Sequence, residues 1–543
     1  MKLLRFALWL FVLPTWINAY GQTLCNHTIP ASQTTVNGVD IAPGDTVCLL
    51  GGNKDFLFFS QLVGTAEKPI VVVNRNGNVI IHTTHFYGIK FSHCKHVKLL
   101  GINSDSYGIR ILKVANGAGI SVDELSTNIE IAYVEVSNTA FGGIYAKTEP
   151  DCSFESTRDK FLLSGLHIHH CYIHDVADEG MYIGSAKYTG QYLPACDTTV
   201  LPHLLTDVRV HDNIVERTGW DGIQVSSTTA DCSIFNNIIR SDSYRETNGQ
   251  MSGILIGGGS NCDCYNNQIL DGKGDGIDIF GFGEMKIYNN LIVRAGKSFQ
   301  PENNNVPKHG IFIGNAPDNA GARFKIMHNT IIKPKTTGLR FSNFFTSANL
   351  FFNNIIANPG ASPNMGEAAY FDNSTAQNNF NLKQNLFSEQ VEPLGFVDFA
   401  NDNYDLRAGS VAVNKAFDAG LNNVPFDILN RPRPHNSASD IGAYECQAVN
   451  ARVQAMGVND RKMNVSFNAE QGKIVSTIFF SSNDIVDFQL FDANGKLLSS
   501  YTELVVGAGE HQFSFSVKSY PPGIYFLQCR SKNHQLSKKF LIQ

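Results

Sequence analysis

Residues 271–280 read DGKGDGIDIF, and the phrase DGIDI inside them is one copy of a pattern that recurs along the chain. The pattern is glycine, an apolar residue, any residue, and a second apolar residue. Because side chains alternate in direction along a strand, this copy predicts a short strand with Ile277 and Ile279 inward and Asp278 outward. The copies are YGIKF, YGIRI, GGIYA, EGMYI, DGIQV, SGILI, DGIDI, HGIFI and TGLRF.

A second phrase, a short alternating run ending in asparagine, lies between these copies, as in SIFNNII and KIYNNLIV. One unit of this size cannot bury its own apolar face, so neighbouring units must stack, which predicts a solenoid of parallel strands. Asparagine tolerates tight turns and its amide can bond the next coil, so we expect an internal asparagine ladder. Its members are Asn213, Asn237, Asn267, Asn290, Asn329 and Asn354, with Cys171 one coil earlier.

Composition supports an all-β chain. Of the 543 residues only 17% are charged and 47 are glycine, which favours a turn-rich surface over helices. The net charge of -6 argues against a broad basic surface for nucleic acid, and we expect none to bind. We expect a monomer.

The N-terminal end predicts export. Lys2 and Arg5 precede an apolar run, and Ala19 and Gly21 fit a small-x-small cleavage pattern, so residues 1–21 are expected to be a signal peptide. No later stretch has the length of a membrane span, so we expect none after cleavage.

Export makes disulfides possible for the 11 cysteines, an odd number that leaves at least one thiol unpaired. The preferred pairs are Cys25 with Cys48 and Cys152 with Cys196. Cys232 and Cys262 would point inward on adjacent coils, and packed core thiols are favoured there over metal ligands.

These repeats resemble the right-handed parallel β-helix proteins of the pectate lyase superfamily, over roughly residues 36–390. The phrases IAPGDTVCLLGG and GTAEKPIVVVNRNGNVII look like the opening coils of the secreted group that includes chondroitinase B and alginate lyases. The resemblance implies a β-helix over residues 22–390. We could not match that group's catalytic Lys and Arg-His phrases in this chain.

Two further resemblances lie toward the C-terminal end. The phrase DIGAYEC is similar to the end of the closing segment of many secreted bacterial β-helices, which implies a segment over residues 391–446 that caps the last coil. After a linker at 447–460, residues 461–543 contain LFDANG, PPGIYFL and a basic stretch before an apolar terminal strand. They look like the C-terminal sorting domain of type IX secretion in Bacteroidetes. This implies a small Ig-like β-sandwich, recognition by the type IX machinery, and release or anchoring at the cell surface.

Stacking turns sequence positions into columns that carry the candidate site. The residues just before each Gly-apolar step are Glu179, Asp221, Ser252, Asp275 and His309, and the outward positions are Tyr182, Gln224, Leu255, Asp278 and Phe312. Asp before Gly also serves turns by bonding its own backbone, which is the structural alternative. Carboxylates on adjacent coils repel, which raises a pKa or invites a calcium ion.

We therefore predict a site for an acidic polysaccharide. The candidate catalytic residues are Asp275, Asp278, Lys273, His309 and Arg340, with Lys273 or Arg340 as the base of a lyase. The candidate sugar-contacting residues are Tyr145, Tyr182, Trp220, Gln224 and Phe312, and calcium would be held by Glu179, Asp221 and Asp275. Long insertions at 149–162, 186–206, 241–250 and 296–308 are expected to wall a groove.

Two alternatives stay open. The phrases GDGIDI and KHGIFIG resemble those of polygalacturonase-type glycosidases, although the paired aspartates expected between them are missing. A non-catalytic adhesin or stalk would use the same columns as a solvated face. The cluster LHIHHCYIHD presents only two histidines in line, so solvated histidines are favoured over zinc. The glycine-rich GILIGGGS opens no helix and is a turn.

Overall fold

The computed structural model describes residues 25–542 with gaps, and the chain divides into two compact units, residues 1–450 and 451–543. The predicted signal peptide and the predicted turn at Asn494 and Gly495 lie outside the described residues. So do the segments 103–106, 283, 300–305, 316–322, 362–368, 374–379, 419–423, 436, 448–462, 469–472, 481–483, 493–496, 507–508, 518–519, 522 and 532–534.

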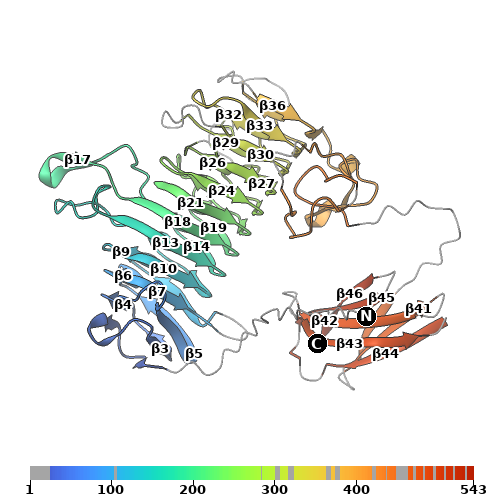
Figure 1. Cartoon of the computed structure of the whole chain (residues 1–543), viewed down its shortest axis with the longest axis horizontal. Helices are drawn as coiled ribbons and strands as arrows, with labels where there is room; N and C mark the ends of the chain where they lie inside the picture. The colour runs from blue at the N-terminus through green and yellow to red at the C-terminus, as the bar shows by residue number, and fades with distance from the viewer. Residues whose placement is uncertain are drawn as a thin grey trace, which may run out of the picture. The chain divides into compact units, whose positions relative to one another are not determined.

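The first unit is a β-helix whose coils stack parallel strands in three ladders (Figure 1). The first ladder is a 12-stranded sheet, and the other two belong to one 23-stranded sheet because the long strand β5 pairs with both β7 and β8. Each Gly-apolar-x-apolar copy from YGIKF onward lies in the first ladder except YGIRI, which contributes β8 of the third. The predicted fold is therefore confirmed.

The strands of the first ladder are β2 (Thr35–Asn37), β4 (Leu57–Ser60), β6 (Tyr87–Ser92), β9 (Ala118–Asp123), β12 (Ile144–Ala146), β15 (Met181–Ile183), β20 (Ile223–Val225), β23 (Ser252–Ile256), β26 (Asp275–Ile279), β29 (Ile311–Ile313), β32 (Leu339–Phe341) and β35 (Phe371–Asp372). The second ladder is β1 (His27–Ile29), β3 (Thr46–Lys54), β5 (Ile70–Thr83), β7 (Lys95–Leu100), β10 (Thr127–Ala132), β13 (Leu162–His169), β18 (Leu204–His211), β21 (Thr228–Phe235), β24 (Cys262–Tyr265), β27 (Lys286–Tyr288), β30 (Lys325–Met327), β33 (Asn349–Phe352) and β36 (Phe380–Lys383). The third is β8 (Ile109–Val114), β11 (Val134–Ser137), β14 (Tyr172–Val176), β19 (Ile214–Thr218), β22 (Ile238–Arg240), β25 (Gln268–Leu270), β28 (Leu291–Val293), β31 (Thr330–Ile332), β34 (Ile355–Ala357) and β37 (Leu386–Ser388).

The repeated glycine is required by the stacking of coils. A Cβ at Gly276 would lie 2.4 Å from the carbonyl oxygen of Gly310 on the next coil and 2.5 Å from a methyl group of Ile292. Ile277 and Ile279 follow it and are fully buried in the core. The pattern therefore brings the first ladder close to its neighbours and fills the interior with branched side chains.

The asparagine ladder is confirmed as a continuous buried chain of hydrogen bonds. The backbone N–H and side-chain amide of Asn267 both donate to the amide oxygen of Asn290, at 3.1 and 3.0 Å, and the same pattern repeats on successive coils. The residue before each member has a left-handed backbone, with φ of 57° at Asn266, so that residue forms the corner. The ladder joins Cys171, Asn213, Asn237, Asn267, Asn290, Asn329, Asn354 and Asn385.

Three disulfides lie in the first unit. The predicted pairs Cys25–Cys48 and Cys152–Cys196 are confirmed. The expectation of free thiols at Cys232 and Cys262 was wrong, because they form a third disulfide. These two residues are register partners on β21 and β24 with Cα atoms 4.4 Å apart, so facing inward on adjacent coils brings their sulfurs together.

The segment after the last coil packs along the flank of the third ladder, whereas we expected it to cap the open end. It contains the short antiparallel pair β38 (Phe396–Asp398) and β39 (Asn403–Leu406) and the 3₁₀ turns Glu392–Leu394 and Phe399–Asn401. Its apolar side chains share a cluster with outward residues of β25, β28, β31 and β34. These outward residues are hydrophobic, which provides the surface for it: Leu270, Leu291, Val293, Ile332, Ile355 and Ala357.

The second unit contains two small antiparallel sheets. One is formed by β40 (Met463–Asn468), β41 (Lys473–Phe480) and β44 (Gly509–Ser516). The other is formed by β43 (Leu497–Val506), β42 (Asp484–Asp492), β45 (Gly523–Ser531) and β46 (Gln535–Ile542). Side chains from both sheets, including Ile474, Phe488 and Phe515, share one core, as in a β-sandwich.

Candidate functional site

Outward side chains of the first ladder form a line across the coils. Strand register places Asp278 between Leu255 and Phe312, and Arg340 follows Phe312. Side chains in register on adjacent parallel strands lie about 4.8 Å apart at the backbone, so neighbours in the line touch. The line is Ser121, Tyr145, Tyr182, Gln224, Leu255, Asp278, Phe312, Arg340 and Asp372.

The residues before the Gly step form a second line at the start of the same strands. Backbone N–H groups of Gly180 and Gly222 donate to the carbonyls of Asp221 and Ser252, at 3.0 and 2.9 Å, and Ser252 is the register partner of Asp275. The N–H of Gly276 donates in turn to the carbonyl of His309 at 2.9 Å. The two lines meet at β26, which carries both Asp275 and Asp278.

Asp275 is an ionic anchor of this region. Its carboxylate accepts from Lys308 Nζ at 3.0 Å and from the backbone N–H of His309. Burial opposes the charge on Lys308, but the nearby Asp275 and Asp278 outweigh it and raise the pKa of the ammonium. Lys308 is therefore a permanent cation at neutral pH.

Asp278 lies in a different environment from Asp275. Burial, and then the charge of Asp275, raise the pKa of Asp278 well above that of an ordinary aspartate, while Lys308 works in the opposite direction. Its Oδ1 is enclosed and has no hydrogen-bond partner in the part of the chain that the structure describes. This environment therefore favours the protonated form of Asp278, next to a carboxyl that is paired with a lysine.

Glu179 and Asp221 are placed too deeply to touch a ligand. They are 1% and 0% exposed, whereas Asp275 and Asp278 keep 7% and 9% of their surface open. Burial raises the pKa of Glu179 to about 7 and that of Asp221 to about 8. Ser252 Oγ also donates to Asp221 at 2.6 Å. The charge of Asp221 contributes to the raised pKa of Asp278, and that of Glu179 to the raised pKa of Asp221.

Asp242 is a member of this cluster that sequence reasoning missed. It lies in the turn after β22, is 1% exposed, and accepts from Ser243 Oγ at 2.7 Å. Burial raises its pKa to about 6, and its charge acts on both Asp221 and Asp278. A single aspartate in an irregular turn gives no sequence signal, because only the fold brings it under the strand.

The two predicted bases are held in ion pairs. Lys273 Nζ lies 2.6 Å from Glu246, and Arg340 pairs with Asp372, its register neighbour on β35. A guanidinium does not give up its proton in proteins, and the amine of Lys273 is engaged by the Glu246 carboxylate. The geometry therefore favours cationic roles for both side chains.

The predicted sugar-contacting residues are spread along the line. Tyr145 and Tyr182 meet edge to face at 5.6 Å, and Lys147 lies over the Tyr182 ring at 4.0 Å. Phe312 stacks on His309 at 5.8 Å. Gln224 is 3% exposed and donates to Ser226 Oγ, so it is largely covered.

Trp220 and His309 stand at the turn that enters the first ladder. The carbonyl of Trp220 accepts from Thr218 Oγ1 at 2.8 Å, and the ring is half-buried. His309 Nδ1 lies 3.1 Å from Thr336 Oγ1. Burial lowers the pKa of His309, so the imidazole is neutral at neutral pH and is a weak base.

The carboxylates do not gather into a metal centre. Among the described residues, no group of three or more His, Cys, Asp or Glu side chains is placed so as to share a metal ion. Glu179, Asp221 and Asp275 lie in line on different coils, with Asp275 already bonded to Lys308. These residues do not fit the predicted calcium site, and we derive no step through a metal.

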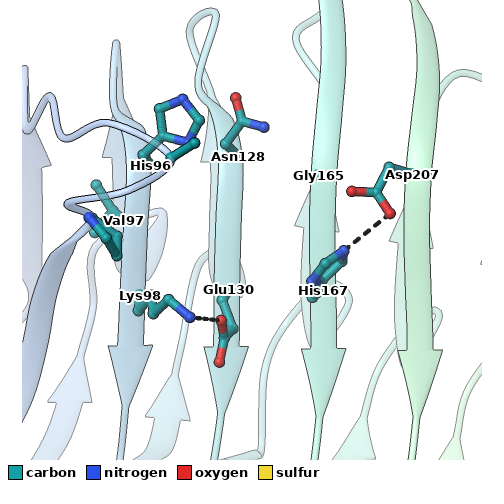
Figure 2. A pocket seen from close by; sticks show the side chains of 10 residues that line it. His96, Val97, Lys98, Asn128, Glu130, Gly165, His167 and Asp207 are labelled. Atoms are coloured by element: carbon teal, nitrogen blue, oxygen red, sulfur yellow. Dashed lines mark hydrogen bonds and ion pairs between the residues drawn. The ribbon is translucent and has the colours of Figure 1, made fainter.

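The histidine cluster lies on the second and third ladders, away from this line. His167 Nε2 is 3.2 Å from Asp207, and His174 is 2.6 Å from Asp175. A cavity of about 230 Å³ beside His167 crosses β7, β10, β13 and β18 (Figure 2). Its charges pair with one another, with Lys98 Nζ 2.6 Å from Glu130. This face is a network of charge pairs rather than a candidate site.

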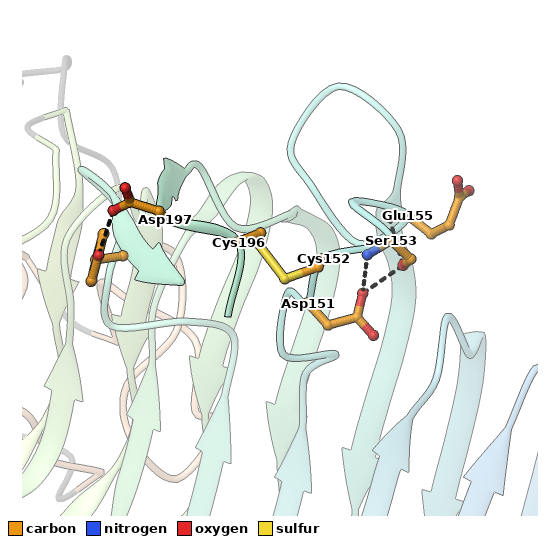
Figure 3. Close-up of a disulfide and its surroundings, with 7 residues drawn as sticks. Asp151, Cys152, Ser153, Glu155, Cys196 and Asp197 are labelled. Atoms are coloured by element: carbon orange, nitrogen blue, oxygen red, sulfur yellow. Dashed lines mark hydrogen bonds between the residues drawn. A yellow bond between two sulfur atoms is a disulfide. The ribbon is translucent and has the colours of Figure 1, made fainter. Parts of the chain in front are cut away.

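Two insertions stand beside the first ladder and are joined to each other. The Cys152–Cys196 disulfide links the loop after β12 to the loop after β15 (Figure 3). The second loop contains the antiparallel pair β16 (Gln191–Leu193) and β17 (Thr198–Val200) with a 3₁₀ turn, Pro194–Cys196. The link fixes both loops as one wall.

Tyr188 connects this wall to the strands that carry the acids. Its ring meets Phe282 edge to face at 5.7 Å, and a Cβ on Gly259 would lie 1.9 Å from that ring. Gly259 also has φ of +73°. A side chain at this position would therefore strain the backbone as well as clash with Tyr188. Phe282 follows β26 closely, which brings the wall to the end of the strand bearing Asp278.

Two family models match parts of the chain, one in each unit. Residues 206–387 match the family model for the right handed beta helix region, and residues 462–543 match the model for the secretion system C-terminal sorting domain. No curated protein matches the chain significantly. In the described part of the chain, no helix is long and apolar enough to cross a membrane.

The similar solved structures include three proteins named for carbohydrate substrates. A lacto-N-biosidase from Eubacterium ramulus is 13% identical over 65% of this chain and 63% of its own, with a TM-score of 0.40. The mannuronan C-5 epimerase A-module from Azotobacter vinelandii is 14% identical over 63% of this chain and 91% of its own, with a TM-score of 0.35. A capsular polysaccharide depolymerase tailspike from Acinetobacter baumannii bacteriophage Fri1 is 8% identical over 96% of this chain and 80% of its own, with a TM-score of 0.31.

Similarities this low assign no activity to the chain. The sorting domain, by contrast, directs export through the type IX secretion machinery to the cell surface or the medium. The chain is a right-handed parallel β-helix protein that carries a type IX secretion sorting domain at its C-terminal end.

Proposed function

We propose that this exported β-helix cleaves a polysaccharide on the outer face of its first ladder, with Asp278 as the acid and Asp275 as the base. The supporting observation is the contrast between the two carboxyls on β26. Asp278 has a raised pKa, and Asp275 is paired with Lys308. Paired carboxyls in opposite protonation states are the machinery of glycoside cleavage.

In hydrolysis, the proton of Asp278 passes to the glycosidic oxygen as the bond to the anomeric carbon breaks. Asp275 takes a proton from the water that attacks this carbon. At the end of the reaction Asp275 is protonated and Asp278 is a carboxylate. Lys308 holds Asp275 in position and stays charged. Phe312 and Tyr182 offer ring surfaces on either side along the line, where sugar faces can pack.

Elimination is the second candidate, because the same pair supplies an acid and a base. The lyase predicted from the sequence used Lys273 or Arg340 to remove the proton next to a uronate carboxylate. Both cations form ion pairs, with Glu246 and Asp372, so Asp275 is the better-placed base. Hydrolysis is favoured because it needs no further group.

The products distinguish the two reactions. The full-length protein incubated with pectate, alginate, chondroitin sulfate and neutral glucans is expected to release reducing ends from one of them without the ultraviolet absorbance of an unsaturated sugar. Reducing ends together with that absorbance would show that the reaction is elimination and not hydrolysis. Binding without any new reducing end on the whole panel would contradict the proposal and favour the adhesin.

A further inference from the structure

A second concave surface lies in the disulfide-linked wall, separate from the carboxyls on β26. It is a cavity of about 710 Å³ at the base of the two insertions, between the segments 154–160 and 200–201. This volume is within the range that holds small ligands. The cavity is lined by Phe154, Thr157, Arg158, Asp159, Lys160, Val200 and Leu201.

The cavity is rigidly constructed for a surface loop. Thr157 forms a bridge with Pro202, and the N–H of Arg158 donates to the carbonyl of Leu201 at 2.9 Å. The Cys152–Cys196 disulfide ties the same two insertions a few residues away (Figure 3). A preformed cavity loses less entropy when a ligand binds.

The chemistry of the lining combines apolar walls with two cations. Leu201 is 43% exposed and, with Phe154 and Val200, gives an apolar surface. Arg158 stacks on Tyr188 at 4.3 Å and donates to its carbonyl, but its enclosed Nε has no acceptor in the described part of the chain. Lys160 is 3.6 Å from Glu155 in a largely exposed pair.

Asp159 is the one carboxylate in the lining, and it is already engaged. It accepts from Thr157 Oγ1 at 2.9 Å, and its hydrogen bonds lower its pKa. The lining therefore carries two cations against one carboxylate, beside an apolar wall. Arginine recognises carboxylate and sulfate groups through its planar fork of donors.

Tyr188 connects this cavity to the proposed site. One side of its ring contacts Arg158, and its edge meets Phe282, which closely follows the strand bearing Asp278. A chain bound along the first ladder therefore has a cationic cavity beside it, on the same wall.

We propose that this cavity binds an acidic sugar unit of the polysaccharide, with its carboxylate or sulfate on Arg158 and Lys160 and its ring against Leu201. This inference rests on the proposed function and specifies its substrate class as acidic glycans. Lys160 supplies a second positive charge that solvent screens. Its contribution to binding is therefore smaller than that of Arg158.

Binding to the full-length protein tests the inference without turnover. The Asp278→Asn protein is titrated calorimetrically with oligogalacturonate, oligomannuronate, chondroitin sulfate oligomers and dextran. We expect an acidic oligomer to bind and dextran not to, and Arg158→Met to weaken that binding by about 10- to 100-fold. Lys160→Met, which disturbs no buried contact, is expected to weaken it by about 2- to 5-fold.

The control for the cavity variants is an arginine on another face of the β-helix. Arg209→Met removes an exposed arginine that pairs with Asp207 on the second ladder, and it should leave affinity unchanged. Chondroitin sulfate carries both carboxylate and sulfate groups, so its binding in the absence of binding by either uronan would indicate sulfate recognition. Equal binding of dextran, unchanged affinity in both cavity variants, or no binding by any oligomer would overturn the inference.

The inference and the proposed function fail in different ways. If wild-type protein releases reducing ends but Arg158→Met binds and cleaves as well as wild type, the cavity has no role while the acid pair stands. If Asp278→Asn still cleaves but Arg158→Met loses binding, the acid assignment falls while the cavity stands.

Discussion

Replacing Asp278 by asparagine is expected to reduce polysaccharide cleavage by about 100- to 10,000-fold, because it removes the proton donor. Folding should be retained, since asparagine has the same shape and burial already disfavours a charge on the Asp278 carboxyl. The measurement is the initial rate of reducing-end release, with circular dichroism to verify the fold. Asp275→Asn should have a comparable effect on rate.

The control for this prediction is Asp263→Asn, which removes a carboxylate from the outer face of β24 where it pairs with Lys286 at 3.4 Å. Its rate should equal that of the wild type. The pH profile gives an independent readout, because an acid with a raised pKa is active below that pKa and loses its proton as pH rises through it. Unchanged cleavage by Asp278→Asn would remove it from the mechanism.

Replacing Glu445 by glutamine is expected to destabilise the first unit by about 3–5 kcal/mol, because it leaves Arg433 as an unpaired buried charge. Both side chains are 1% exposed, and Arg433 Nη1 lies 3.0 Å from Glu445. Arg433 also donates to Asn289 Oδ1 at 3.3 Å, on the corner of a coil. This pair therefore links the closing segment to the β-helix.

Guanidinium unfolding of the full-length protein, followed through the transition of the first unit, measures this effect. Asp405→Asn is the control, since its pair with Arg431 is partly exposed and should contribute less than about 1 kcal/mol. A loss for Glu445→Gln as small as that of the control would show that the closing segment is held by its apolar cluster alone.

The repeated phrases were sufficient to predict the coils. A larger residue at position 276 would clash with the next coil. Ile277 and Ile279 point inward and are buried in the core. The asparagine ladder followed from the same reasoning, since a buried amide must find a partner on the next coil. Periodic constraints of this kind are local, so a single sequence displays them.

The protonation states in the site could not be read from the sequence. The register of Asp275 and Asp278 was predictable, but the ion pair of Lys273 with Glu246 depends on a turn of irregular length. A partner found through such a turn has no periodic signal.

Contacts between non-repeating segments were equally hidden. The Cys232–Cys262 disulfide needed a register accurate to one residue, because a slip by one would turn one sulfur outward. Asp242 reaches the site from a turn at the corner of a coil. The closing segment packs on the flank of the third ladder because that flank is apolar. These outcomes follow from three-dimensional packing rather than from sequence patterns.

We predict that Asp278 carries a proton at neutral pH, beside the Asp275 carboxyl that is paired with Lys308. The most direct measurement is the infrared difference spectrum between the wild-type protein and Asp278→Asn at neutral pH, with Asp275→Asn recorded in parallel. We predict a protonated carboxyl carbonyl band that disappears in Asp278→Asn. Loss of only carboxylate bands in that variant would contradict the account.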